Sequence, residues 1–154
     1  MDEREVTTTA GAPEQVGLSF LTLAYRLREQ VDQRMIATAG LSLSRTKVLQ
    51  ALAGRGALHQ AELASSLGQA PRSVTQIVEG LERLGLVART GDPEDRRRKT
   101  VSLTDTGRTT LAAAEQAGTH ALRQCFGLLE PQQLATLDAL LAHLDIALTG
   151  DTAG

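Results

Sequence analysis

Aromatic residues and long apolar runs are scarce in this chain of 154 residues. The sequence has one tyrosine, two phenylalanines and no tryptophan, so we expect no pocket lined mainly by aromatic side chains. No apolar run approaches the roughly 20 residues that a helix needs to cross a bilayer. The acidic first residues lack the basic start and apolar stretch of a signal peptide. The sequence therefore predicts a cytoplasmic protein without a membrane segment.

Residue patterns that carry catalysis or bind metal ions are also missing. The three histidines, His59, His120 and His143, are far apart in the sequence. None has a carboxylate or cysteine at a metal-ligand spacing on the same helical face, and no glycine-rich phosphate loop follows a strand-like run. We therefore expect no enzyme activity, no catalytic residue, no metal site and no cofactor. His59 stands where a helix cap is expected.

The formal net charge of −2 is distributed unevenly along the chain. Residues 40–104 carry ten Lys or Arg against six Asp or Glu, whereas the remainder carries six against twelve. The central segment is thus net positive and the rest is net negative. Because nucleic-acid affinity depends on local neutralisation of phosphates, this asymmetry is typical of a DNA-contacting lobe on an acidic scaffold.

Two short helical patterns joined by a tight turn lie within the basic segment. The first spans residues 60–67 and ends at Gly68, a residue type that readily adopts the left-handed conformation. The second spans residues 71–84 and begins with Pro71, whose fixed φ suits the first helical position. Its inward stripe consists of Val74, Ile77, Val78, Leu81 and Leu84. Two helices in this arrangement predict a helix-turn-helix.

The opposite face of the second pattern carries four polar side chains in its first two turns, namely Arg72, Ser73, Thr75 and Gln76. Arg and Gln have paired donors or acceptors that match the edges of guanine and adenine in the major groove. We predict that this face contacts DNA. An ordinary solvated helix surface has a similar composition, so the composition alone leaves both interpretations open.

Two strand-like runs follow, at 86–90 and 99–103, with a loop at 91–98 between them. This loop is too long for a two-residue hairpin turn, so it must project from the strands. Four consecutive cations at its end, Arg96, Arg97, Arg98 and Lys99, would project with it. Together these patterns predict a winged helix-turn-helix.

Long amphipathic patterns at both ends of the chain flank this module. The apolar stripe of the first consists of Val16, Phe20, Leu23, Leu27, Val31 and Met35. The stripe of the last, which begins at Pro131, consists of Leu134, Leu137, Leu140, Leu141, Leu144 and Leu148. Because the small winged module cannot bury such long helices, we expect a homodimer in which the terminal helices of two chains interleave. A helical bundle closed within one chain is the alternative.

These patterns define a mainly α fold with a small two- or three-stranded β wing. The winged helix-turn-helix DNA-binding domain spans 41–104, and 14–40 with 105–149 form the helical dimerisation region. The polar segments 1–13 and 150–154 are expected to be disordered tails.

Several short motifs in this order resemble the MarR (multiple antibiotic resistance regulator) family of bacterial transcription factors. Asp95-Arg96-Arg97 resembles the Asp-x-Arg pair of that family's wing, and Val101-Ser102-Leu103-Thr104 with Gly107 resembles the signature that follows it. The similarity extends to Glu62-Leu63-Ala64 and to Leu81-Glu82 with Gly85-Leu86-Val87. The order of helices fits the family over roughly residues 15–148.

The resemblance implies a dimeric, ligand-responsive repressor of bacterial promoters that binds a pseudo-palindromic operator in double-stranded DNA. It also implies that Asp95 holds Arg97 so that the guanidinium enters the minor groove. Arg96, Arg98 and Lys99 would then meet phosphates. A helical interaction protein whose winged module binds another protein is the alternative from a different class.

Effector binding is a further implication of the resemblance. In the family, small and often phenolic or anionic ligands bind in a cleft between the helical region and the winged module and release DNA. The matching positions would come from the first helix, from the helix that follows Ser42 and from the long helix that begins at Asp105. On the first helix they lie around Tyr25, Arg26 and Arg28, although a solvated helix face is the more usual role of the two arginines.

Oxidant sensing is a property of some members of the resembled family, whose reactive cysteine lies near the start of the first helix. The single cysteine here, Cys125, lies among apolar residues late in the predicted long helix that begins at Asp105. A cysteine in such surroundings is usually a small buried residue of low reactivity. A cysteine-based redox-sensing regulator therefore stays an alternative and not the main prediction.

Overall fold

The computed structural model describes residues 11–150, which form six α-helices and three short strands. The elements are α1 (Pro13–Ala39), α2 (Leu43–Arg55), β1 (Leu58–His59), α3 (Gln60–Leu67), α4 (Pro71–Arg83), β2 (Val87–Gly91), β3 (Lys99–Leu103), α5 (Asp105–Phe126) and α6 (Pro131–Gly150). The predicted class, mainly α with a small β wing, is confirmed. The predicted tails lie for the most part outside the described residues. None of the described helices is long and apolar enough to cross a membrane.

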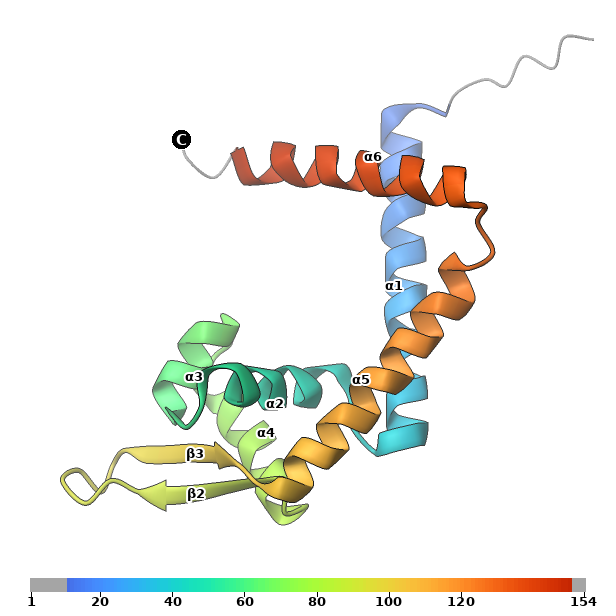
Figure 1. The fold of residues 1–154 in the computed structure, drawn as a ribbon. Coiled ribbons are helices and arrows are strands. Elements are labelled where there is room, and N and C mark those ends of the chain that lie inside the picture. Colours follow the sequence, from blue (N-terminus) through green and yellow to red (C-terminus); the bar gives the residue numbers. More distant parts are fainter. Residues whose placement is uncertain (1–10, 151–154) are drawn as a thin grey trace, which may run out of the picture.

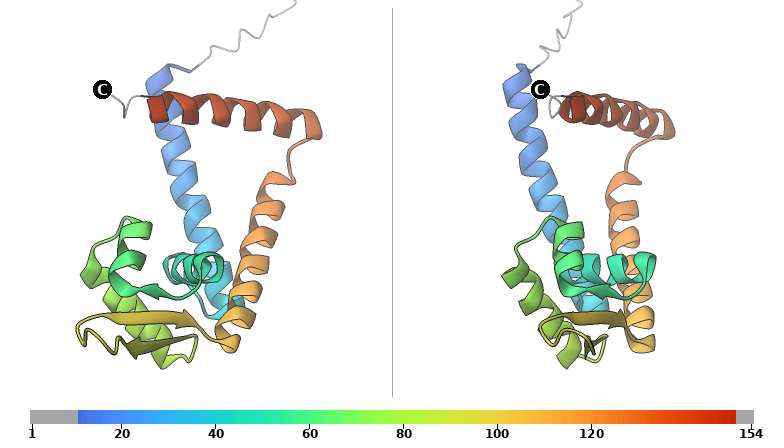
Figure 2. Two further views of the ribbon diagram at one scale, coloured as in Figure 1. Left: turned by 60° about the vertical axis from the view of Figure 1, so that its left-hand side comes forward. Right: turned by 90° about the vertical axis from the view of Figure 1, so that its left-hand side faces the viewer.

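The elements are arranged at two levels (Figure 1). α2, α3, α4 and the strands gather at one end, and α1 and α5 extend away from them. α6 lies at the far end of α1 and α5, well separated from the strands (Figures 1 and 2). The winged module and the terminal helices are thus distinct parts of one chain.

Short-range capping determines where the helices of the winged module begin. Ser42 Oγ accepts a hydrogen bond from the backbone N–H of Arg45 at 3.3 Å, as expected of an N-cap residue. α4 begins at Pro71, as predicted. Asp32 of α1 supplies a long-range cap as well, since its Oδ1 accepts from the backbone N–H of Leu43 at 2.7 Å. This bond ties the first turn of α2 to α1.

The sheet has three antiparallel strands in the order β1-β3-β2. β2 pairs with β3 along its whole length, from Val87 opposite Leu103 to Gly91 opposite Lys99. The two-residue strand β1 pairs with the other edge of β3 and is the third strand that the predicted fold class allowed. The wing loop is therefore held by a pairing that anchors β3 on both sides.

One hydrophobic core joins α2, α3, α4 and the sheet to the near ends of α1 and α5. Its fully buried side chains include Leu49 of α2, Leu63 of α3 and Val101 of β3. The core thereby fixes the orientation of α4 relative to the wing, because both pack on the same set of apolar residues.

The inward face of α4 follows the prediction except at its end. Val74, Val78 and Leu81 are completely buried, which confirms their predicted orientation. Leu84 is 52% exposed, so the prediction that it faces the core is wrong. The reason is local: α4 ends one residue earlier, and the chain then turns through Gly85, whose φ is 72°.

α1 and α5 pack together where they approach the winged module. Val31 and Met35 of α1 are buried there. Gly118 of α5 lies opposite, and a Cβ at this position would be 3.3 Å from Met35 Sδ. The small residue therefore permits the close approach of the two helices, which diverge farther from the module (Figure 2).

The outer part of α1 and the whole of α6 expose large apolar side chains in the single chain. Val16, Phe20 and Leu23 of the predicted stripe are 57%, 48% and 58% exposed. α6 has no buried residue. The alternative of a helical bundle closed within one chain is therefore wrong, because α6 does not bury its apolar residues against the other described helices.

Candidate nucleic-acid interface

The outer face of the first turns of α4 presents polar side chains to solvent. Arg72, Ser73 and Gln76 are exposed there, on the side opposite the buried Val74. The N-cap residue, Ala70, provides no side-chain hydrogen bond to the first turn. Backbone N–H groups at this end carry the positive end of the helix dipole, so the start of α4 combines side-chain donors with a favourable field for anions.

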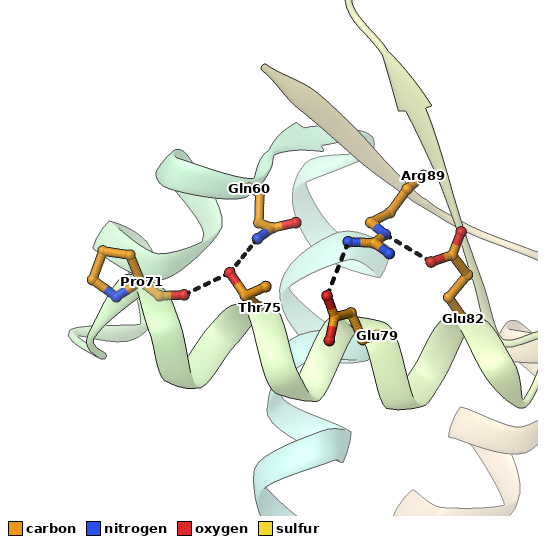
Figure 3. A network of polar contacts seen from close by, with 6 residues as sticks. All are labelled: Gln60, Pro71, Thr75, Glu79, Glu82 and Arg89. Atoms are coloured by element: carbon orange, nitrogen blue, oxygen red, sulfur yellow. Dashed lines mark hydrogen bonds and ion pairs between the residues drawn. The ribbon is translucent and has the colours of Figure 1, made fainter. Parts of the chain in front are cut away.

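Thr75 differs from the other three predicted contact residues. Its Oγ1 accepts a hydrogen bond from Gln60 Nε2 of α3 at 2.6 Å and donates to the Pro71 carbonyl oxygen at 2.9 Å (Figure 3). The only hydroxyl donor of Thr75 is therefore committed within the protein. This residue links α3 to α4, and its side chain is only partly accessible.

The wing loop is ordered by backbone hydrogen bonds around two aspartates. Asp95 Oδ1 accepts from the backbone N–H of Arg97 at 3.0 Å, and the Asp95 carbonyl oxygen accepts from the N–H of Arg98 at 2.9 Å. Asp92 closes the loop, because its N–H donates to the Arg98 carbonyl oxygen at 2.9 Å. The Asx turn at Asp95 and the two backbone hydrogen bonds together fix the backbone from which the arginine side chains project.

The relation between Asp95 and Arg97 thus differs in detail from the one that the resemblance implied. The carboxylate holds the backbone of Arg97, and no ion pair joins it to an arginine side chain within residues 11–150. Arg96, Arg97, Arg98 and Lys99 are all exposed. Their guanidinium and ammonium groups are available to phosphates or to a DNA groove.

A groove of about 380 Å³ brings the two predicted contact regions together. It lies between the start of α3, the outer edge of α4 and the wing. The residues that line it are Gln60, Ala61, Pro71, Thr75, Glu79, Arg89, Arg97 and Lys99. Two of the four wing cations, Arg97 and Lys99, therefore face the same groove as α4.

A cluster of three charged side chains at this groove was not foreseen from the sequence. Arg89 of β2 places Nε 2.7 Å from Glu82 Oε2 and Nη1 3.9 Å from Glu79 Oε1 (Figure 3). Both glutamates belong to α4 and lie three residues apart, on adjacent turns of one edge. The sequence carries no signal for this contact, because the chain reverses at Gly85 between the partners.

A second cleft, of about 440 Å³, opens between α1, α2 and α5. Val31, Met35 and Leu122 supply apolar surface, and Lys47 supplies a cation. Gln50 also lines the cleft, and its Nε2 donates to Oε1 of Glu115 at 3.0 Å, which joins α2 to α5. This cleft lies between the terminal helices and the winged module.

The structure does not bring the three predicted effector residues together at that cleft. The Tyr25 hydroxyl is exposed and donates to Glu29 Oε1 at 2.9 Å, and this hydrogen bond and the glutamate charge raise the pKa of Tyr25. Arg26 lines a separate crevice of about 340 Å³ between α1 and α5, which also includes the half-buried Cys125. Arg28 is exposed and lines neither cavity.

The chemistry of the described residues gives no metal centre. Within residues 11–150, no group of three or more His, Cys, Asp or Glu side chains is arranged to hold a metal ion. His59 is the residue before α3, where a cap was expected, and its backbone N–H donates to Glu62 Oε2 at 3.0 Å. Its ring Nδ1 lies 3.3 Å from Thr100 Oγ1 of β3.

Comparison with known proteins places this geometry in a family. A sequence model described as the MarR family matches residues 39–98. A Thauera aromatica protein named as a transcriptional regulatory protein for the hcr operon is 30% identical over 115 residues, which cover 75% of this chain and 69% of that protein.

Solved structures agree with this assignment. Sco3205 of Streptomyces coelicolor, a MarR family transcriptional regulator crystallised in complex with DNA, has a TM-score of 0.71 and 28% identity, with 88% of this chain and 86% of that chain covered. BpsR of Bordetella bronchiseptica, whose DNA binding is regulated by 6-hydroxynicotinic acid, has a TM-score of 0.67 and 27% identity, with 85% and 98% covered. With its recognition helix, wing and terminal helices in the same order, the chain belongs to the MarR family of DNA-binding transcriptional regulators.

Proposed function

We propose that the protein acts as a homodimeric, ligand-responsive repressor that binds a pseudo-palindromic operator in double-stranded DNA. The observation that carries this proposal is the apolar surface that one chain leaves open on α1 and α6. The exposed large side chains of α6 are Leu134, Leu140, Leu144, Ile146 and Leu148. Surfaces of this kind on a folded chain mark an interface, and a second copy offers the same helices in return.

Dimerisation determines how the winged modules meet DNA. The apolar surfaces of α1 and α6 lie at the end of the molecule far from α4 and the wing (Figure 1). A twofold contact through them leaves both modules free to contact one face of a duplex. The expected operator has two inverted half-sites whose centres are about one helical turn, or roughly 10 base pairs, apart.

Within each module, Arg72, Ser73 and Gln76 are the proposed base-contacting residues in the major groove. Thr75, predicted from the sequence as a fourth, instead positions α4 against α3 through its hydroxyl. The support for this distinction is the exposure of the first three side chains and the two hydrogen bonds of Thr75.

The wing residues have separate proposed roles. Arg97 faces the groove beside α4 and enters the minor groove, where a narrow A·T tract attracts a guanidinium. Arg96, Arg98 and Lys99 meet phosphates. Asp95 orders the loop through the backbone of Arg97, as its hydrogen bond at 3.0 Å supports.

The proposed effector site is the cleft between α1, α2 and α5, in place of the surface around Tyr25, Arg26 and Arg28. Its lining combines apolar side chains with one cation, Lys47, and one carboxylate, Glu115, which accepts a hydrogen bond from Gln50. Apolar surface with a few polar groups suits a small phenolic molecule, and Lys47 is the group that would meet an anionic substituent. α2 shares the core with α4, so a ligand that spreads α1, α2 and α5 shifts the recognition helix and lowers DNA affinity.

Selection of bound duplexes from random-sequence DNA by the full chain tests this function. We expect enrichment of inverted repeats and two chains per duplex by sedimentation. Affinity for the selected duplex falls steeply with salt, since phosphate contacts release counterions. Enrichment of a single half-site bound by one chain would contradict the dimeric arrangement, and the absence of any enriched sequence would contradict operator recognition.

A further inference from the structure

The ion-pair cluster of Arg89, Glu79 and Glu82 lies at the junction of the recognition helix and the wing. The side chain of Arg89 is only 17% exposed, whereas those of Glu79 and Glu82 are 50% and 39% exposed. The Nε–Oε2 distance of 2.7 Å to Glu82 is that of a charge-assisted hydrogen bond, and the 3.9 Å contact to Glu79 is a looser ion pair. Within residues 11–150, these are the side-chain ion pairs that the structure contains.

We propose that Arg89 is a positioning residue that sets the angle between the wing and the recognition helix. In this role it determines whether α4 and the wing can contact one duplex simultaneously. The inference deepens the proposed function and rests on it, because it presupposes that the wing and α4 bind the same DNA.

The location of Arg89 in the sheet supports this role. Arg89 is the middle residue of β2 and lies opposite Val101 of β3. Val87, at the base of the strand, is buried in the core, whereas Thr90 and Gly91 are exposed. The ion pair with Glu82 therefore fastens β2 to α4 at the point where the strand leaves the core and the wing begins to project.

The groove beside the cluster shows what the angle between the wing and α4 controls. Arg89 and Glu79 line it together with Arg97 and Lys99 of the wing and Thr75 of α4. On its other side, Gln60 holds Thr75 from α3 (Figure 3). The edge of α4 that faces the groove is thus held at two places, by α3 near its start and by the wing near its end. A wing that is free to tilt would change the separation between Arg97 and the base-contacting residues.

The charges of the cluster distinguish positioning from direct DNA contact. The guanidinium of Arg89 is shared between two carboxylates that would otherwise repel nearby phosphates. If Arg89 were simply a phosphate contact, removal of Glu82 would free the cation and strengthen DNA binding. If Arg89 positions the wing, removal of Glu82 weakens DNA binding even though a negative charge is lost. The two roles therefore predict opposite signs for one substitution.

The experiment measures dissociation constants of the full chain at several salt concentrations. The probe is a duplex selected from random-sequence DNA by the parent protein, prepared with A·T-rich and G·C-rich flanks. The variants are Arg89→Ala, Arg89→Lys, Glu82→Ala and the double substitution Arg89→Ala with Glu82→Ala. Arg83→Ala is the matched control, because Arg83 is an exposed cation in the last turn of α4 that takes part in no ion pair within residues 11–150. Thermal unfolding of each variant verifies that it is folded.

We expect Arg89→Ala and Glu82→Ala each to weaken DNA binding by about five- to twentyfold. The double variant should bind DNA no more weakly than Arg89→Ala alone, because both substitutions remove the same interaction. The salt slope, which is the change of the logarithm of the DNA affinity with the logarithm of the salt concentration, stays at the parent value. The loss of DNA affinity is larger on duplexes with A·T-rich flanks, where Arg97 depends on correct placement. Arg89→Lys, which keeps the charge but loses the planar donor group, is expected to lose affinity as well.

Tighter binding by the Glu82→Ala protein would overturn the positioning role. So would parent-like binding by Arg89→Lys combined with a salt slope lowered by about one in Arg89→Ala, which is the behaviour of a phosphate contact. Failure of the parent protein to select or bind any duplex would instead refute the proposed function itself, so the two failures are distinguishable.

Discussion

Gly107 of α5 is the position where one added methyl group is expected to have the largest effect on the fold. A Cβ at this residue would lie 2.1 Å from the Leu86 carbonyl oxygen, 2.8 Å from Leu103 Cδ1 and 3.0 Å from the Leu86 carbonyl carbon. The first contact is with backbone, so no side-chain rotation relieves it. The start of α5 or the segment before β2 must move by about 1 Å to restore an ordinary contact.

The displaced groups form the joint between α5 and the wing. The Thr104 N–H donates to the Leu86 carbonyl oxygen at 3.1 Å, and Thr104 Oγ1 accepts from the Gly107 N–H at 3.0 Å. Overpacking costs about 1–3 kcal/mol, and loss of an N-cap costs about 1 kcal/mol. The higher helix propensity of Ala offsets about 1 kcal/mol. We therefore expect Gly107→Ala to lower the free energy of unfolding by about 1–3 kcal/mol, the balance of these terms.

Urea unfolding of the full chain at one fixed protein concentration measures this effect. Gly54→Ala is the matched control, because Gly54 lies in the last turns of α2 and a Cβ there meets no atom within 4 Å. The control is expected to gain about 0.5–1 kcal/mol. A Gly107→Ala protein as stable as the control would refute the argument that the close approach at Leu86 requires glycine.

Four other predictions concern DNA binding and assembly. Arg72→Ala is expected to make the free energy of DNA binding less favourable by about 1–3 kcal/mol and to relax the base preference at one position per half-site. Selection from random-sequence DNA measures this preference. Equal weakening on all sequences would identify Arg72 as a phosphate contact instead. Leu144 is 54% exposed in the single chain, so Leu144→Asp should leave a monomer folded. At a dimer interface the new carboxylate would be buried without a partner, so we expect the dimer to dissociate, as measured by sedimentation. An intact dimer would show that α6 is not part of the interface. Asp95→Ala removes a negative charge near DNA, which on Coulomb grounds alone should tighten DNA binding. Because the Asp95 carboxylate fixes the backbone of Arg97, we instead expect weaker binding in titrations with A·T-flanked duplexes. Tighter binding would contradict this role of Asp95. Arg98→Ala, in the same titrations, should weaken binding evenly across flanks and lower the salt slope by about one.

Local signals in the sequence predicted most helix and strand boundaries of the winged module. Pro71 marks the start of α4, and the strand predicted at 99–103 coincides with β3. The residue types needed for these structures act within a few positions of the chain, through φ restrictions, capping and apolar spacing. For the same reason the prediction was wrong at Leu84, where the helix ends and the apolar spacing no longer defines a face.

The candidate site was predictable only where it lies on a single element. The exposed face with Arg72 and Gln76 follows from the helical period of α4, and the cationic loop follows from its composition. The proposed effector residues depend on which side of α1 faces α2, which the helical period of α1 alone does not specify. In the structure, Val31 and Met35 are the residues of α1 that line the cleft shared with α2 and α5.

The sequence by itself determined the helices of this protein, its two longer strands, the inward face of α4 as far as Leu81 and the family to which it belongs, because these depend on short-range spacing and on motifs in a recognisable order. Only the tertiary structure decided which groups meet across chain reversals. Examples are Arg89 with Glu82, Gln60 with Thr75, and Asp32 with the first turn of α2. Such contacts depend on the packing of whole helices and strands around a common core, which places residues within hydrogen-bond distance irrespective of their spacing in the chain.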